Sequence, residues 1–220
     1  MSSFSLLRFR FLPSLSVSVF PHFLISHPPV ATASLHYQSH SQPHNHHHDV
    51  ALFNRMLLMR PPPPTFHFNM ILSSLANMKR YPTAISLFKQ LESNGITSDV
   101  FTLNILINCF CHLAHITLSF AVLANILKRG YHPNAITLTT LIKGLCFRGE
   151  IKKALHFHDE VVAQGFQLSQ VSYGTLINGL CKTGETKAAV QLLRKLEGHS
   201  VKPDVVMYTT IIDSLCKNKL

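Results

Sequence analysis

Tryptophan is absent from this chain of 220 residues, and charged residues make up only 14% of it. No apolar run reaches the about 18 residues that a membrane-spanning helix needs, so the sequence predicts no membrane span. The five cysteines are odd in number and unlike a secreted disulfide framework, which favours a reducing compartment. The CxxC, HExxH, GxSxG and Walker motifs are also missing, and the spacing of His156 and Asp159 is common on solvated helices. We therefore predict neither enzymatic activity nor a bound cofactor.

Acidic residues are scarce relative to basic ones, because 10 Asp and Glu face 20 Lys and Arg, a net charge of +10. The first 48 residues contain only Arg8 and Arg10 among the basic residues, so a net charge of +8 belongs to the rest. A basic body favours a polyanionic partner, such as nucleic acid or an anionic membrane surface. With 46% hydrophobic residues, the chain can also bury a substantial core.

Residues 1–48 contain no Asp or Glu but hold ten serines, a composition typical of an organelle transit peptide, which we assign to residues 1–36. A secretory signal is the alternative, but Pro13 and Pro21 interrupt its apolar stretch. A histidine-rich linker follows at 37–48. Its HNHHH run could bind a transition metal, but it lies in a Ser/Pro/Gln-rich segment without fixed geometry, so we predict no metal site.

A repeat of 35 residues organises the remainder. Cys111, Cys146, Cys181 and Cys216 follow one another at this interval, within the aligned phrases ILINCFC, TLIKGLC, TLINGLC and TIIDSLC. Equivalent points on packed hairpins lie about 10 Å apart, too far for zinc or disulfides, so the cysteines are predicted to be small core residues. The interval divides the chain into a degenerate half-repeat with a Pro-rich linker (49–64), full units at 65–99, 100–134, 135–169 and 170–204, and a partial unit at 205–220.

Each unit contains two predicted helices. In the third unit, apolar residues recur at i, i+3, i+4 and i+7 from Leu138 to Leu145, and Gly149 ends that helix. A second apolar set from Ile151 to Val161 predicts another helix. Because one helical pair cannot bury both its apolar faces, neighbouring pairs must stack into an all-α solenoid.

The segments YGTLINGLCKTGE (173–185), AAVQLLRKLE (188–197) and VKPD (201–204) resemble pentatricopeptide (PPR) repeats. The resemblance covers residues 65–220, and the 35-residue interval without tryptophan separates it from tetratricopeptide repeats. TFHFNMILSSLANMKRYPTAISLFKQLES (65–93) further resembles the P-type, fertility-restorer-like branch of plant organelle proteins. This resemblance implies a right-handed superhelical solenoid of helix-turn-helix repeats. It also implies a non-catalytic RNA-binding protein of the mitochondrion or, alternatively, the chloroplast.

By this resemblance, the fifth and last residues of each unit select one RNA base per repeat. The pairs are Asn69 with Asp99, Asn104 with Asn134, Thr139 with Ser169, and Gly174 with Asp204, and Thr209 begins a fifth pair. The first pair resembles a uracil reader and the second a pyrimidine reader. The third and fourth depart from the common pairs, and Thr209 leans towards a purine.

Two further sets of residues follow from the same resemblance. The second residue of each unit would sandwich bases: Phe66, Phe101, Ile136, Val171 and Val206. Lys182 and Lys217 would contact phosphates, whereas His112 and Phe147 occupy the equivalent positions of earlier units.

Simpler structural roles compete with these assignments. Asp99, Asn134 and Asp204 directly precede predicted helices, where they would act as N-caps whether or not RNA is bound. Phe66 and Phe101 could equally be core residues.

The predicted function is binding of single-stranded RNA that affects processing, stability or expression of an organelle transcript. About four repeats would select about four bases, so a recruited processing factor or a homodimer would have to add selectivity. The alternatives are a helical scaffold that binds protein, and a truncated family member without function.

Overall fold

The computed structural model describes residues 46–197 and 201–217, which contain ten α-helices and no β-strand. The predicted all-α fold is confirmed. The helices are α1 (His46–Leu58), α2 (Thr65–Asn77), α3 (Tyr81–Ser93), α4 (Val100–His112), α5 (Ile116–Lys128), α6 (Ala135–Phe147), α7 (Ile151–Ala163), α8 (Gln170–Lys182), α9 (Thr186–Glu197) and α10 (Val205–Lys217). Helices α2, α4, α6, α8 and α10 begin at the first residues of the five units proposed from the repeat.

The transit peptide predicted at 1–36 and most of the linker at 37–48 lie outside the described residues. His46 to His48 form the first turn of α1, and Nε2 of His46 lies 3.3 Å from Oγ1 of Thr83. Across the described ranges, no three His, Cys, Asp or Glu side chains gather as a metal site would require. No helix in these ranges has the length and apolarity needed to cross a membrane.

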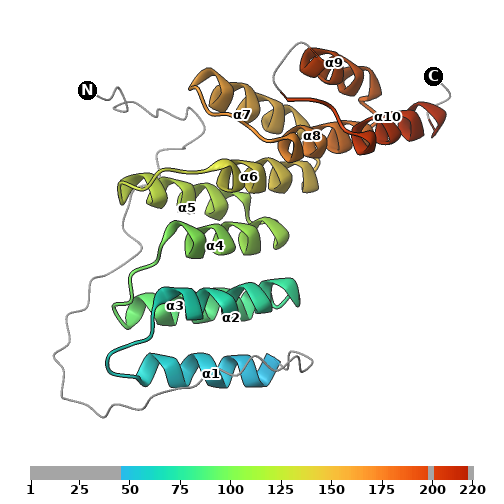
Figure 1. Cartoon of the computed structure of the whole chain (residues 1–220). Coiled ribbons are helices and arrows are strands. Elements are labelled where there is room, and N and C mark those ends of the chain that lie inside the picture. The colour runs from blue at the N-terminus through green and yellow to red at the C-terminus, as the bar shows by residue number, and fades with distance from the viewer. Residues whose placement is uncertain (1–45, 198–200, 218–220) are drawn as a thin grey trace, which may run out of the picture. The chain divides into compact units, whose positions relative to one another are not determined.

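Residues 46–109 form one compact unit, in which α1, α2 and α3 pack against one another (Figure 1). At its centre, the buried rings of Phe53 and Phe68 meet edge to face with centroids 5.1 Å apart. Ala84 on α3 is also buried, and its small side chain lets α3 lie close to α2. One face of α2 is therefore held in the core, while its opposite face carries exposed Phe66.

Residues 110–197 and 201–217 belong to a second compact unit. Helix α6 packs against α5, α7 and α8, and α8 packs in turn against α9 and α10 (Figure 1). Phe120 and Phe157 meet edge to face with centroids 5.3 Å apart, and Ala154 and Ala189 are fully buried. The first helices of three successive repeats, α6, α8 and α10, therefore follow one another as direct neighbours.

Glycine ends the first helix of the third unit, as predicted. Gly149 has a φ of +71°, its amide donates to the carbonyl of Cys146, and the amide of Glu150 donates to that of Leu145. These bonds satisfy carbonyls at the end of α6, and a side chain at residue 149 would be strained in this left-handed conformation. The chain can then reverse and begin α7 at Ile151.

A cysteine of one repeat packs against a small residue on the first helix of the next. A Cβ atom added to Gly144 would lie 2.9 Å from Cβ of Cys111. One repeat later, a Cβ atom added to Gly179 would lie 2.9 Å from Sγ of Cys146. Both distances are shorter than van der Waals contact, so glycine allows these helices to approach closely.

The third occurrence of this contact is polar. Cys181 hydrogen-bonds to Ser214, which stands where the third and fourth units have glycine. Oγ of Ser214 also lies 2.7 Å from Oγ1 of Thr186. Isoleucine occupies the equivalent of Thr186 in the third unit, where Ile151 contacts Gly179. The contact with glycine is therefore made by an apolar isoleucine, and the contact with serine is made by a polar threonine.

The expectation that the repeated cysteines are core residues holds only in part. Cys111 is buried and Cys146 and Cys181 are half-buried, but Cys216 is exposed, so the expectation is wrong for Cys216. Burial raises the pKa of the Cys111 and Cys146 thiols to about 11, and also raises the pKa of Cys181. These three thiols therefore stay protonated near neutral pH and serve packing rather than nucleophilic chemistry.

Candidate functional site

The second residues of all five repeat units are exposed. Phe66 is 65% exposed and Phe101 is 56% exposed, so the alternative that they belong to the core is wrong. Ile136, Val171 and Val206 are exposed as well. Apolar side chains in this position are free to contact a ligand, and aromatic ones can stack on a planar ring.

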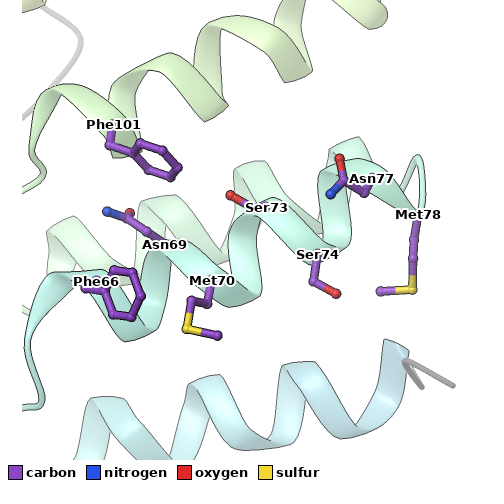
Figure 2. A pocket seen from close by; sticks show the side chains of 8 residues that line it. All are labelled: Phe66, Asn69, Met70, Ser73, Ser74, Asn77, Met78 and Phe101. Atoms are coloured by element: carbon purple, nitrogen blue, oxygen red, sulfur yellow. The ribbon is translucent and has the colours of Figure 1, made fainter. Parts of the chain in front are cut away.

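An open pocket of about 400 Å³ lies along α2 and the beginning of α4. Figure 2 shows the Asn69 side chain between the rings of Phe66 and Phe101. The pocket lining consists of Phe66, Asn69, Met70, Ser73, Ser74, Asn77, Met78 and Phe101. Two apolar rings with a polar group between them suit a flat ligand whose edge carries hydrogen-bonding atoms.

Asn69 and Asp99, the first predicted base-reading pair, are hydrogen-bonded to each other. Nδ2 of Asn69 lies 3.2 Å from both carboxylate oxygens of Asp99. Oδ1 of Asn69 accepts from the hydroxyl of Thr102 at 2.7 Å. Asn69 is only 3% exposed although it lines the pocket, so its amide is held in one place by its neighbours.

Asp99 is also the N-cap of α4. Its Oδ1 accepts from the backbone amide of Thr102 at 2.7 Å, and the Thr102 hydroxyl, whose single proton is shared with Oδ1 of Asn69, lies at the same distance. Burial acts to raise the pKa of Asp99, but hydrogen bonds from the Thr102 amide, the Thr102 hydroxyl and Asn69 outweigh it. The pKa of this carboxyl is therefore held below its ordinary value, and the group is anionic at neutral pH.

The arrangement leaves a donor beside an acceptor. The Nδ2 group of Asn69 has two protons, so it can donate one to Asp99 and the other to a ligand. The anionic carboxylate of Asp99 has further lone pairs that can accept a hydrogen bond. The pair is complementary to a ring edge that presents an acceptor next to a donor.

Asn104 and Asn134, the second predicted pair, belong to the two different compact units. Asn104 is buried on α4. Asn134 forms a capping box with Thr137, in which the Asn134 side chain accepts from the Thr137 amide at 3.0 Å. The N-cap role proposed for Asn134 is thus confirmed.

The third pair, Thr139 and Ser169, is connected through Ser172. Oγ1 of Thr139 lies 2.6 Å from Oγ of Ser172, which lies 3.4 Å from Oγ of Ser169. Thr139 also donates to the carbonyl of Ala135 at 2.6 Å. Since a threonine hydroxyl has one proton, this bond leaves Thr139 as the acceptor from Ser172.

The fourth pair, Gly174 and Asp204, has an apolar partner. Asp204 caps α10, because its Oδ1 accepts from the Met207 amide at 2.9 Å. Cε of Met207 would lie 3.6 Å from a Cβ atom on Gly174. Thr209, the first member of the fifth pair, is exposed and hydrogen-bonds to the carbonyls of Val205 and Val206.

The predicted phosphate-contacting lysines are exposed at helix ends. Lys182 is the last residue of α8 and Lys217 the last of α10. At the equivalent positions, the rings of His112 and Phe147 lie 5.4 Å apart, and Nζ of Lys143 lies 5.4 Å from the Phe147 ring centroid. A positive charge is therefore present near this surface of the third unit, although it comes from a different residue.

Comparison with known sequences decides the family. The sequence pattern of the PPR repeat family matches residues 63–112, 133–182 and 168–217. These matches together cover more than half of the chain. The chain belongs to the PPR repeat family.

Named PPR relatives match short stretches of the chain. A mitochondrial pentatricopeptide repeat-containing protein of Arabidopsis thaliana is 40% identical over 53 residues, which are 24% of this chain and 10% of that protein. A second mitochondrial protein of this kind from the same plant is 42% identical over 54 residues, 24% of this chain and 9% of its own length. The chain thus matches about a tenth of the length of these relatives.

Solved PPR structures share the fold. The pentatricopeptide repeat protein PPR10 in complex with an 18-nucleotide psaJ RNA element has a TM-score of 0.68 at 23% identity, covering 78% of this chain and 26% of that chain. PPR10 from maize gives a TM-score of 0.62 at 25% identity over 71% and 22%. The PPR domain of Arabidopsis thaliana protein-only RNase P 1, in complex with tRNA, gives 0.55 at 19% identity over 67% and 78%. The all-α helical-repeat solenoid is therefore the fold of this chain.

The sequence analysis did not single out the third residue of a unit, which contacts the candidate site in three repeats. Thr102, Ser172 and Met207 each contact the fifth residue of the preceding unit, 33 residues earlier. Their positions recur at the 35-residue interval, so the sequence shows that these residues are equivalent. The interval does not show which residue each of them contacts.

Proposed function

We propose that this PPR chain binds single-stranded RNA and that its first complete repeat selects a base through Asn69 and Asp99. The observation that carries the proposal is the hydrogen-bonded Asn69–Asp99 pair in a pocket between two exposed phenylalanine rings. The solved RNA complex of PPR10, which has the same fold, supports it. The RNA complex of the RNase P 1 PPR domain adds weight.

The flat faces of a nucleobase fit the walls of the pocket. Phe66 and Phe101 expose their rings on either side of Asn69 (Figure 2). Stacking on such rings contributes roughly 1–3 kcal/mol per base and does not depend on which base it is. A base in a single strand can enter because its edge is not paired and it can be unstacked from its neighbours.

The edge of the base would then be selected by the polar pair. Uracil presents a carbonyl oxygen next to an N–H group, so Asn69 can donate to the oxygen while Asp99 accepts from the N–H. Cytosine presents an unprotonated ring nitrogen in that place, which would face the anionic Asp99 carboxylate. Guanine has the same donor and acceptor pattern as uracil but is larger, which makes it the informative competitor.

Positively charged side chains would attract the phosphates of an RNA backbone. The net charge of +8 outside the first 48 residues favours a polyanion. Exposed Lys182 and Lys217 can contact phosphates from the ends of α8 and α10. Such contacts release counterions, so binding weakens as salt rises.

The mitochondrial relatives favour a role in a mitochondrial transcript's processing, stability or expression. Because about four repeats select about four bases, we expect a processing factor or a second copy to add selectivity. Import is tested by fusing residues 1–48 to a fluorescent reporter and following its location in plant cells. Retention of the reporter in the cytosol would contradict the mitochondrial assignment, and accumulation in chloroplasts would replace it.

The binding proposal is tested by fluorescence anisotropy of the full chain with oligo(U), oligo(C), oligo(G), oligo(A) and oligo(dT), at low and moderate salt. We expect salt-sensitive binding with a preference for oligo(U) over oligo(C). Asn69→Ala should reduce that preference about tenfold, the range of one well-made base contact. Asn54→Ala, which replaces an exposed asparagine on α1 away from the pocket, is the matched control.

The outcomes separate the candidate functions. No RNA binding by the folded wild-type chain at low salt would contradict the proposal and favour a protein-binding scaffold. Binding that Asn69→Ala leaves unchanged for every oligonucleotide would keep RNA binding but remove base selection by the first repeat. Absence of a cooperative thermal transition would favour the nonfunctional alternative.

A further inference from the structure

The hydroxyl of Thr102 sits at the centre of the first site although it does not line the pocket. Thr102 is fully buried, and its Oγ1 lies 2.7 Å from Oδ1 of Asn69 and 2.7 Å from Oδ1 of Asp99. Its backbone amide donates to the same Asp99 oxygen. One residue of the following repeat therefore touches both members of the base-selecting pair.

These contacts favour one of the two orientations of the Asn69 amide. An asparagine side chain presents an oxygen on one side and an NH₂ group on the other, and rotation by half a turn exchanges them. In the observed orientation, the oxygen shares the proton of the Thr102 hydroxyl with the Asp99 carboxylate, and the NH₂ group faces that carboxylate. The reversed orientation would place the oxygen against an anionic carboxylate, so Thr102 and Asp99 together direct an N–H group towards the ligand.

Other repeats show that the third residue follows the chemistry of the fifth residue before it. Thr139, which has a hydroxyl, meets the hydroxyl of Ser172 at 2.6 Å. Gly174, which has no side chain, meets the apolar Met207. Asp204 nevertheless caps the same helix as Met207, as Asp99 does for the helix of Thr102. The third residue is therefore apolar where the preceding fifth residue has no polar side chain, although the aspartate that caps the helix is retained.

We propose that the third residue of a repeat is a specificity-determining positioning residue for the base-selecting side chain of the preceding repeat, with Thr102 orienting Asn69. The inference rests on the proposed RNA-binding function. Thr102 acts through Asn69 and Asp99, because it is buried and does not line the pocket. Base preference is then set by three positions, with the third fixing which atom of the fifth faces the base.

The first experiment compares Thr102→Val with Thr102→Ser in the full chain. Valine keeps the shape and the backbone amide of threonine but removes the hydroxyl, whereas serine keeps the hydroxyl. We expect Thr102→Val to lower the oligo(U) to oligo(C) preference by about fivefold or more, approaching Asn69→Ala, and Thr102→Ser to stay within about twofold of wild type. A purely structural role would weaken binding to both oligonucleotides equally and leave the ratio unchanged.

A second readout does not need RNA. The Thr102 hydroxyl lowers the pKa of Asp99, so Thr102→Val should raise that pKa while Thr102→Ser should not. NMR titration of the Asp99 carboxyl carbon measures this, and the Asn69 side-chain amide signals report the change in its environment. Unchanged signals in Thr102→Val would overturn the inferred contact even if RNA binding were never studied.

The fourth repeat allows the constellation to be rebuilt if Thr102→Val fails to fold. Gly174→Asn combined with Met207→Thr places asparagine, threonine and Asp204 in the register of Asn69, Thr102 and Asp99. We expect the double variant to gain a base preference of about fivefold at this repeat, and Gly174→Asn alone to gain less than about twofold. Equal gains in both variants would show that the third residue is not needed.

Failure of the inference and failure of the proposed function give different results. If the folded wild-type chain does not bind RNA, the proposed function fails and this inference fails with it. If wild type and Thr102→Val bind RNA with the same base preference, the inference alone is overturned.

Discussion

The first and fourth complete repeats share a helix-capping aspartate but differ in the residue that faces it. In each, an aspartate caps the next helix by accepting a hydrogen bond from the backbone amide of the third residue of the next unit. Asp99 accepts from Thr102, and Asp204 accepts from Met207. The first repeat places Asn69 beside this aspartate, whereas the fourth has Gly174. The cap is thus independent of the side chain that faces it.

The apolar side chains beside the two sites also differ. The first is flanked by two exposed aromatic rings, while Val171 and Val206 occupy the equivalent positions of the fourth. A valine offers an apolar surface without a ring face. The helical frame is thus retained while the rings and polar side chains that the proposed base contacts require vary from repeat to repeat.

The largest expected effect comes from removing the aromatic walls. Phe66→Ala and Phe101→Ala should each weaken RNA binding roughly tenfold, because stacking contributes about 1–3 kcal/mol per base. Val171→Ala and Val206→Ala should change the affinity less than about twofold. Thermal melting should hardly change, since all four side chains are exposed. Equal losses of affinity in the valine variants would remove the contrast between the two sites.

Two glycines on α8 test whether packing requires the glycine of the fourth site. Gly179→Ala should lower the free energy of unfolding by about 1–2 kcal/mol, because its Cβ atom would lie 2.8 Å from Cδ1 of Ile151. Gly174→Ala should raise it by about 0.5–1 kcal/mol, since alanine favours helix and the nearest atom would lie at 3.6 Å. Urea unfolding measures both. A destabilising Gly174→Ala would show that packing, and not an empty reading position, explains this glycine.

Removing either capping aspartate should lower the stability by a similar amount, but only the loss of Asp99 should change the base preference. Asp99→Ala and Asp204→Ala should each cost about 1 kcal/mol of stability, because each removes the N-cap of a first helix. Only Asp99→Ala should also reduce the oligo(U) to oligo(C) preference in anisotropy titrations. If Asp204→Ala reduces it as much, the fourth repeat selects a base without a polar fifth residue.

The smallest expected effect is on pH dependence. The pKa of Asp99 is depressed in the folded state, so its contribution to stability is present above its unfolded pKa of about 3.9 and is lost as the pH falls through the lower folded pKa. The contribution is small because the residue is exposed and screened by solvent. Urea unfolding of wild type and Asp99→Asn across this acidic range measures it, and identical pH profiles would argue against the hydrogen bonds that Asp99 accepts.

Sequence periodicity was sufficient for the fold because each repeat carries the same helix signals. The glycine at 149 ends its helix as predicted, and Asp99, Asn134 and Asp204 do cap the helices that follow them. These features depend on neighbours within a few residues along the chain. Local spacing therefore contains the information needed to predict them.

Contacts between repeats could not be predicted in the same way. The exposure of Phe66 depends on what covers its helix, and the exposure of Cys216 depends on what packs beside the last described helix. The contact of Thr102 with Asn69 spans 33 residues, which is not the period of the repeat. The interval shows which residues are equivalent, but only the stacked helices show which of them meet.

The 33-residue contact also determines where this array could be cut for protein engineering. A segment taken at the repeat boundaries, residues 65–99, would carry Phe66, Asn69 and Asp99 into a new host but leave Phe101 and Thr102 behind. A segment of residues 66–102 carries both rings, the base-selecting pair and the hydroxyl that orients it. Under the proposed function, the portable recognition module is thus longer than one repeat and overlaps its neighbour, and we expect that swapping repeats at their helical boundaries does not transfer specificity.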